Sequence, residues 1–297
     1  MKMKILAAVK FSEDRNPVVE TSVNFACHIG ASLHFLHVVD RTPLRRSFVR
    51  EMPESMKEYL VKRGEEILRN AKKQAKVCGI SVKTLLMEGN PEDVIVKEAE
   101  KRDILIMRSR VFSPAERLGS VVERVLSRIT APVMLVNEPQ DRFDICLVPV
   151  DGSEESFKSL YEIKNRNEIY RFKKVVILHI HRSGERTAED ERAVDSVKDK
   201  ISGTCERDIY GHRVVLEAAE GIVRGSVPRV VCEVVHTSRD VADAILEYSA
   251  EIGADILFMG MTGKGRIQRF FMGSVSRRVA SYSKVPVVIF PEKYVPA

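Results

Sequence analysis

The sequence predicts an α/β protein of two tandem domains, each a Rossmann-like parallel sheet of five strands with helices on both faces. Three observations predict this fold: the length of 297 residues, an internal repeat, and short apolar runs that alternate with longer helical segments. At about 150 residues per domain, the length suggests two domains. Continuous apolar strands separated by helices are typical of parallel sheets covered on both faces. The crossover rules then give a doubly wound sandwich.

The first repeat predicts strands and helices in alternating order. Runs rich in valine, isoleucine and leucine predict the strands, and amphipathic segments between them predict the helices. In chain order these are strand 3–9, helix 16–29, strand 33–39, helix 53–78, strand 80–87, helix 91–101, strand 103–107, helix 119–129 and strand 132–136. Gly30 directly follows the first helix and is predicted to be its C-cap.

The second half repeats the first. From Gly119 and Gly273 onward, 9 of 20 aligned positions are identical, and both copies end in a Pro-Val strand, at 132–136 and 286–290. The second copy follows the same order, although the polar, glycine-containing segment 183–228 predicts a mixture of helix and irregular chain. We therefore predict one domain over 1–139 and another over 143–297.

Composition excludes several classes of protein. The chain is 44% hydrophobic and 30% charged, as soluble globular proteins are. No uncharged apolar run reaches about 18 residues, so no membrane span is expected. The N-terminal apolar run is too short for a signal peptide, which predicts a cytoplasmic protein. Five widely spaced cysteines without a CxxC pair argue against a disulfide framework or zinc site and favour reduced thiols.

The excess positive charge lies entirely in the first half. Residues 1–140 hold 24 Lys+Arg and 18 Asp+Glu, whereas residues 141–297 hold 24 of each. Most of the basic residues belong to helical segments that also carry glutamate, which is typical of solvated helix faces. Because the sequence has no aromatic platform or DNA-binding motif, this charge does not predict nucleic-acid binding.

A glycine-rich loop follows the fourth strand of the second copy. Gly260, Gly263 and Gly273-Ser274 have the spacing G-x2-G-x9-G-S. Glycines allow tight turns and close backbone approach, and Gly273-Ser274 opens a helix whose free amides and dipole favour an anion. Lys264 adds positive charge. The loop is typical of a phosphate-binding site, and a flexible strand-to-helix connection is the structural alternative.

Asp151 follows the first strand of the second copy. Ligands on such sheets bind beyond the carboxyl ends of strands, where the strand order reverses, so Asp151 is expected to share a crevice with the glycine loop. Its carboxylate can accept hydrogen bonds from ribose hydroxyls. An N-cap role for Asp151 is the alternative, but Ser153 is able to cap the helix while Asp151 faces a ligand.

These residues resemble the universal stress protein family. The Val-Asp-Gly-Ser after the first strand, the glycine loop and the closing Pro-Val-Val-Ile strand occur in the family's order. The resemblance implies an adenine nucleotide alpha hydrolase-like fold that binds AMP or ATP, with Mg²⁺ possible beside a triphosphate. It implies an internal pseudo-dimer through the last strands, and a homodimer is also possible. The nucleotide-binding residues it implies are Asp151, Ile180, Met259, Gly260, Gly263, Lys264, Gly273, Ser274 and Val275.

The first copy departs from this pattern. Lys10 and Phe11 replace Asp151 and Gly152, and of the loop glycines only Gly119-Ser120 remains. A bulky side chain and cations should disfavour adenosine there, so we predict no nucleotide in the first half in the family's manner. The basic residues, Arg108 among them, leave a different anion open.

The sequence predicts a binding module and no catalytic residue or metal site. His179 and His181 alternate on one strand, but no further ligands are evident. Asp151 and His236 are the only candidate bases near the loop. Two alternatives stay open: a slow Mg²⁺-dependent ATP hydrolase using the same site, and a scaffold whose basic first half binds an acidic partner.

Overall fold

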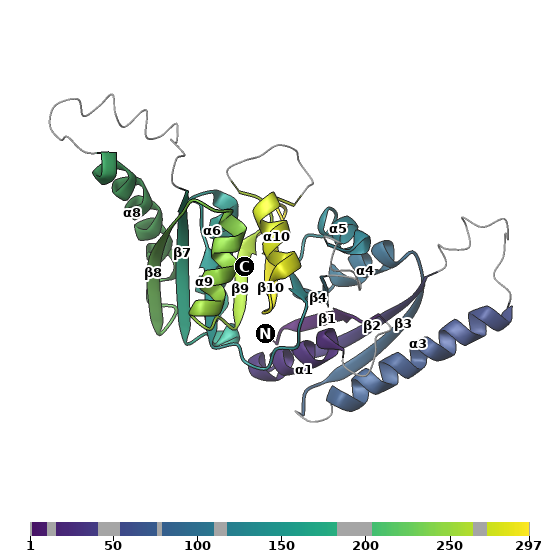
Figure 1. Cartoon of the computed structure of the whole chain (residues 1–297). Helices are drawn as coiled ribbons and strands as arrows, with labels where there is room; N and C mark the ends of the chain where they lie inside the picture. Colours follow the sequence, from purple (N-terminus) through teal and green to yellow (C-terminus); the bar gives the residue numbers. More distant parts are fainter. Residues whose placement is uncertain are drawn as a thin grey trace.

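The computed structural model is a single elongated α/β protein with one continuous sheet (Figure 1). It describes residues 2–10, 16–40, 54–75, 79–109, 118–182, 204–263 and 272–296, and the side chains of 204–210 are not included. The first half contains β1 Lys4–Ala8, α1 Pro17–Ile29, β2 Ser32–Asp40, α3 Glu54–Gln74, β3 Val82–Gly89, α4 Pro91–Ala99, β4 Ile104–Arg108, α5 Ser120–Leu126 and β5 Val133–Val136. The second half contains β6 Ile145–Pro149, α6 Glu154–Tyr170, β7 Lys174–Arg182, α8 Thr204–Val223, β8 Arg229–Thr237, α9 Val241–Glu251, β9 Ile256–Gly260, α10 Ser274–Tyr282 and β10 Val287–Phe290.

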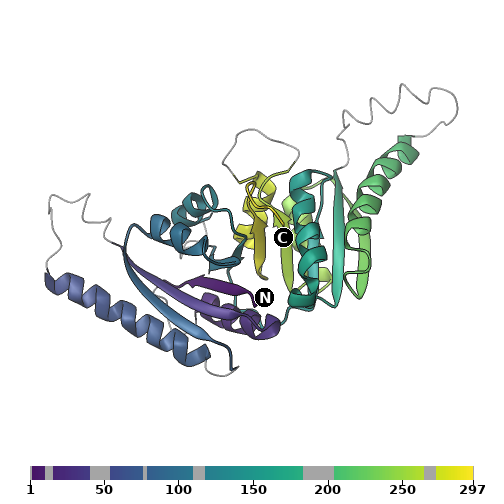
Figure 2. The ribbon, with the colours of Figure 1, turned by 180° about the vertical axis from the view of Figure 1, so that it is seen from behind.

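The ten strands have the order β3-β2-β1-β4-β5-β10-β9-β6-β7-β8. All neighbours within each half are parallel, and the two halves join through β5 and β10, which are antiparallel. Met134 pairs with Val288 at the middle of this junction. The predicted α/β fold is confirmed, and the two halves form an internal pseudo-dimer through their last strands (Figure 2).

Helices cover the sheet on both faces, and each face has its own core. One core contains buried side chains of α1, α3, α6 and α8, such as Phe25 and Leu160. The other contains those of α4, α5, α9 and α10, such as Val122 and Val279. Because central strands such as β4 and β9 are buried on both faces, their sequences are continuous apolar runs, whereas the edge strands β3 and β8 are only partly buried and contain polar residues.

A buried carboxylate marks the contact between the halves. Glu162 of α6 accepts hydrogen bonds from the hydroxyls of Tyr170, at 2.7 Å, and Tyr294. Arg166 lies 3.7 Å from Glu162 and 3.6 Å from Asp103 of the first half. Burial and the neighbouring Glu162 raise the pKa of the Tyr170 phenol well above its usual value, so this phenol stays a neutral donor to Glu162.

Gly30 is the C-cap of α1 with φ of 66°, as predicted. Cys146 and Cys232 are free thiols, but Cys27 forms a disulfide, so the expectation of reduced thiols is wrong at Cys27. Spacing in the sequence did not reveal this bond, because a disulfide depends on how closely two cysteines approach in the folded chain. Within the described ranges, no helix is long and apolar enough to cross a membrane.

In each half, a histidine of the second strand forms a hydrogen bond to the residue that follows the first strand. His37 of β2 bonds through Nδ1 to the carbonyl of Val9 at 2.8 Å, and His179 of β7 bonds in the same way to Val150 at 2.7 Å. The carbonyl is an acceptor only, so the ring donates. The repeat therefore extends to a tertiary contact as well as to the element order.

We expect His37 to make the protein less stable as the pH is lowered. Burial lowers the pKa of His37 below its usual 6.5, more than the bond to Val9 raises it. At His37 the unfolded chain therefore binds a proton more tightly than the folded chain does. The free energy of unfolding is highest above pH 6.5 and decreases as the pH falls through 6.5 toward the lower pKa of the folded state. The urea midpoint of the wild type should drop between pH 7.5 and 5.5 by more than that of His37→Gln. Equal drops would contradict this.

Candidate functional site

The carboxyl ends of β6 and β9 meet where the strand order reverses. β6 pairs with β7 on one side and with β9 on the other, so the chain runs outward from β6 and later returns beside it. Asp151 follows β6, and Gly260 is the last residue of β9. This is the switch point at which ligands bind in open α/β sheets.

Asp151 is held in place by the turn that begins α6. Its Oδ1 accepts hydrogen bonds from the amide of Ser153, at 2.9 Å, and from the Ser153 hydroxyl, at 2.6 Å. The Ser153 hydroxyl in turn accepts from the amide of Ser156 at 3.2 Å and caps α6. Gly152 between them has φ of 81°, a left-handed value that favours glycine. The cap role of Ser153 is as predicted, and Ser153 fixes the Asp151 carboxylate beyond the carboxyl end of β6.

Two loop glycines lie against the Asp151 turn. A β-carbon added at Gly263 would lie 2.3 Å from Oδ2 of Asp151, and one added at Gly260 would lie 2.6 Å from the carbonyl oxygen of Glu155. Both distances are far inside van der Waals contact. At Gly260 the neighbour is backbone, so any larger residue would require the chain to shift. At Gly263 the neighbour is the Asp151 side chain, which would have to move away.

Replacing Gly260 with alanine should destabilise the second half. The methyl group would meet the backbone of Glu155, which is the first turn of α6, so the backbone has to shift. We expect a loss of about 1–3 kcal/mol, typical of overpacking. Gly221→Ala in α8 is the matched control, because nothing lies within 4 Å of its added β-carbon and alanine gains up to about 1 kcal/mol in a helix. Denaturant unfolding with equal losses for both would contradict this account.

The first turn of α10 faces the same loop. Gly273 is its N-cap and, in the described part of the chain, no side chain caps the helix and no acidic residue lies in its first turn. The Gly273 amide donates to Met261 at 2.9 Å, which fixes the helix start beside β9. Ser274 is exposed and Val275 half-buried. The amides that follow Gly273 are thus positioned to meet an anion.

The other predicted site residues have different environments. Met259 is buried in the core on the α9 and α10 side of the sheet, so its side chain packs there. Ile180 of β7 is half-buried against the same core and pairs with Val235. Lys264 lies outside the described residues.

The equivalent end of the first half keeps the turn but changes its charge. The Gly119 amide donates to Ser109 at 3.1 Å, as Gly273 does to Met261, and α5 likewise begins without a side-chain cap. Exposed Lys10 and half-buried Arg108 follow β1 and end β4. A cation thus occupies the place of the Asp151 carboxylate.

Four histidines gather in the second half, which sequence reasoning did not foresee. His181 of β7 pairs with His236 of β8, and their ring centroids are 5.1 Å apart. His212 of α8 lies 4.4 Å from His181 and 4.8 Å from His179. Within the described ranges, however, no three histidine, cysteine or acidic side chains are arranged to hold a metal ion. The alternating His179 and His181 were the only signal in the sequence.

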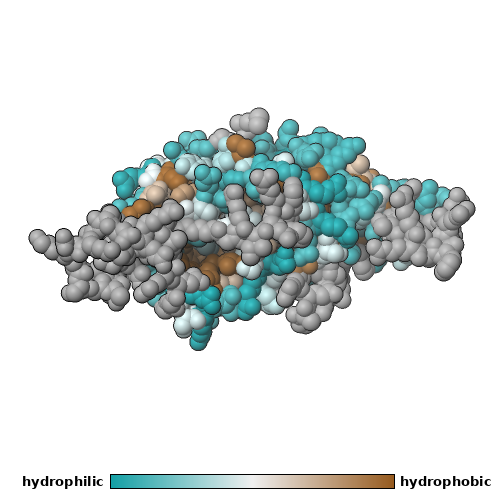
Figure 3. Space-filling model, turned by 90° about the horizontal axis from the view of Figure 1, so that it is seen from above, coloured by the Kyte–Doolittle hydropathy of each residue, from teal (hydrophilic) through white to brown (hydrophobic). Residues whose placement is uncertain are grey.

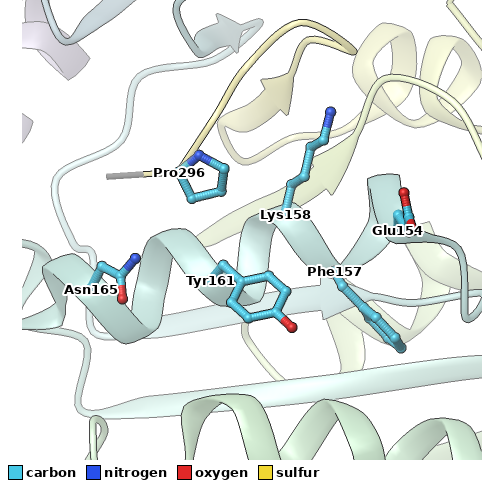
Figure 4. Close-up of a pocket in the computed structure, with 6 residues that line it drawn as sticks. All are labelled: Glu154, Phe157, Lys158, Tyr161, Asn165 and Pro296. Carbon is cyan, nitrogen blue, oxygen red and sulfur yellow. The ribbon is translucent and has the colours of Figure 1, made fainter.

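A groove lies along α6, away from the predicted nucleotide-binding residues. This groove of about 420 Å³ follows α6 and the C-terminal segment, and none of the predicted nucleotide-binding residues lines it; its walls are Glu154, Phe157, Lys158, Tyr161, Asn165 and Pro296 (Figure 4). Seen from above, the molecule is mostly hydrophilic, with a hydrophobic recess left of centre (Figure 3). The α6 groove therefore does not include the residues predicted to bind a nucleotide.

Comparison with known proteins gives consistent matches. The universal stress protein family matches residues 1–137 and 142–291. Universal stress protein MJ0531 of Methanocaldococcus jannaschii is 31% identical over 141 residues, which are 46% of this chain and 83% of that protein. MJ0577 of the same organism is 28% identical over 154 residues, 46% of this chain and 95% of that protein. A universal stress protein from Archaeoglobus fulgidus has a crystal structure with a TM-score of 0.69 at 23% identity, covering 97% of this chain and 98% of that one.

Proposed function

Because this chain belongs to the universal stress protein family, we propose that its second half binds an adenine nucleotide and acts as a regulatory or sensing module. The observation that carries the proposal is the close approach of the Gly260–Gly263 loop to the fixed carboxylate of Asp151. No catalytic residue is assigned.

The residues of the crevice fit the parts of a nucleotide. The Asp151 carboxylate, already oriented by Ser153, suits the hydroxyls of a ribose. The first-turn amides of α10, with Ser274 beside them, suit a phosphate group. We expect the adenine to lie against the main chain at Ile180 of β7, the strand that pairs with β6 on the side opposite β9. Lys264 would add charge to the phosphates.

Differences between the two halves explain why we expect only the second half to bind a nucleotide. The first half retains the Gly119 turn, but Lys10 follows β1 where Asp151 follows β6. An ammonium group cannot accept a hydrogen bond from a ribose hydroxyl. We therefore expect one adenine nucleotide per chain.

Calorimetry on the full chain tests the proposal directly. AMP, ADP and ATP are titrated separately, the last with and without Mg²⁺. Saturable binding of one nucleotide per chain supports the proposal, and the absence of heat at about millimolar nucleotide would overturn it. Phosphate release measured in the same samples separates binding from hydrolysis, because release that requires Asp151 and Mg²⁺ would make the protein an enzyme.

A further inference from the structure

A second polar pocket lies at the opposite edge of the sheet, in the first half. It has a volume of about 430 Å³ and is lined by five basic residues and two serines. We call it the amino-end pocket and define it by its basic residues, Lys4, His34, Lys83, Lys101 and Arg102. These residues come from the starts of β1, β2 and β3 and from the turn between α4 and β4, whereas the crevice at Asp151 lies beyond carboxyl ends.

Two of the three lysines of this pocket carry charge that the described part of the protein does not neutralise. Within the described residues, neither Lys4 nor Lys83 has a side-chain ion pair. Lys101 bonds to Glu98 at 2.6 Å. The nearby Asp103 carboxylate accepts from the backbone amide of Lys4 at 2.8 Å and pairs with Arg166 at 3.6 Å. The pocket therefore has a surplus of positive charge, which favours an anion.

Arg102 and His34 form a fixed wall of the pocket. The Arg102 guanidinium, only 9% exposed, bonds through Nη1 to the Glu98 carboxylate at 2.7 Å. Its other nitrogens lie 3.0 and 3.3 Å from Nδ1 of His34. Because guanidinium only donates, Nδ1 is an acceptor and the proton of the neutral ring is on Nε2. His34 thus offers an N–H donor beside three ammonium groups.

The second half shows that this pocket is not a by-product of the fold. The amide of Ile145 bonds to Asp255 at 2.9 Å, as that of Lys4 bonds to Asp103, so the two positions are equivalent. Around Ile145, Asp144 pairs with Lys173 at 3.0 Å. Gly253 and Ala254 precede Asp255 where Lys101 and Arg102 precede Asp103. Lys174 and Arg229 keep positive charge at the starts of β7 and β8, but the basic pair that precedes the aspartate, Lys101 and Arg102, has no counterpart in the second half.

We propose that the amino-end pocket binds a small anion bearing two or more phosphate charges. Ammonium groups are strong phosphate partners, and the Arg102 nitrogens are already engaged, so Lys4 and Lys83 make the contacts while Arg102 supplies charge. A volume near 430 Å³ suits a small ligand. Apart from the imidazole of His34 no aromatic ring lines the pocket, so stacked bases of single-stranded nucleic acid lack a platform.

Titration with inorganic pyrophosphate, followed by NMR of the histidine rings, tests this proposal. His34→Gln identifies the His34 signals, which separates this pocket from any phosphate bound near Asp151. We expect saturable shifts of His34 and a rise in its pKa, because an anion offsets the positive charge of Arg102, Lys83 and Lys4, which now lowers that pKa together with burial. Added salt should weaken the binding.

Paired variants give the decisive comparison. Lys4→Ala/Lys83→Ala should weaken pyrophosphate binding by about tenfold, while Lys97→Ala, an exposed lysine of α4 outside the pocket, should change it less than about twofold. Equal effects of the two variants would overturn the proposal. So would unchanged His34 signals at about 10 mM pyrophosphate, or shifts caused only by an RNA or DNA oligonucleotide.

Discussion

Asp151→Ala is expected to weaken nucleotide binding about 10- to 150-fold, which corresponds to about 1.5–3 kcal/mol for lost charge-assisted hydrogen bonds. The carboxylate is preorganised, because Ser153 holds Oδ1 through two hydrogen bonds. A fixed acceptor loses little rotational freedom when it binds, so its removal should appear fully in the affinity. Calorimetry with ATP measures the change.

Two further variants make this prediction specific. Asp151→Asn keeps one acceptor oxygen but loses the charge, so its affinity should lie between those of the wild type and Asp151→Ala. Asp141→Ala removes an exposed carboxylate of the linker and should leave affinity unchanged. Thermal unfolding checks that each variant is folded. If Asp151→Ala binds as tightly as Asp141→Ala, Asp151 does not contact the ligand.

Phe258→Ala is expected to cost about 3–5 kcal/mol of stability, as the deletion of large buried rings does. Phe258 of β9 is fully buried, and its ring centroid lies 5.3 Å from those of Tyr170, Phe172 and Phe290. The deletion would leave a cavity among these rings and remove their edge-to-face contacts. Phe258 lies two residues before Gly260, so its removal weakens the packing of the strand that positions the glycine loop.

Urea unfolding measures this loss against an exposed aromatic residue. Tyr59 of α3 is 63% exposed, so Tyr59→Ala should change stability by no more than about 0.5 kcal/mol. Phe258→Leu refills part of the cavity and should cost less than Phe258→Ala. A loss below about 1 kcal/mol for Phe258→Ala would show that this cluster does not anchor β9.

Local patterns predict most of this fold. The strands of the first half lie within a few residues of their predicted positions, because apolar runs mark strands that are covered on both faces. No bounds were predicted for β8 Arg229–Thr237, an edge strand in which polar residues interrupt the apolar run. The ends of the helices were predicted less accurately. The segment predicted as helix 119–129 is α5 Ser120–Leu126, since terminal turns lack a strong apolar period.

The candidate site could be predicted because its residues follow strand ends. Asp151 and Gly260 lie at the carboxyl ends of β6 and β9, and the topology brings these ends together. The spacing of the glycines also indicated close approach, which Gly263 shows against Asp151. The part that depends on residue 264 lies outside the described residues.

Features that depend on distant packing could not be predicted. The histidine group needs His212 of α8 to face β7 and β8, and the polar segment that contains α8 has no clear period. The amino-end pocket needs the register that pairs His34 with Lys83 and places Arg102 beside them. Net charge showed which half was basic, but it could not locate a pocket.

A crystal structure of the full chain grown with ATP tests the central claim most directly. We predict density for one adenine nucleotide between Asp151 and the first turn of α10, and none beyond β1 and β4 of the first half. Nucleotide density at the first-half position instead, or an empty crevice at Asp151 at saturating ATP, would contradict the account.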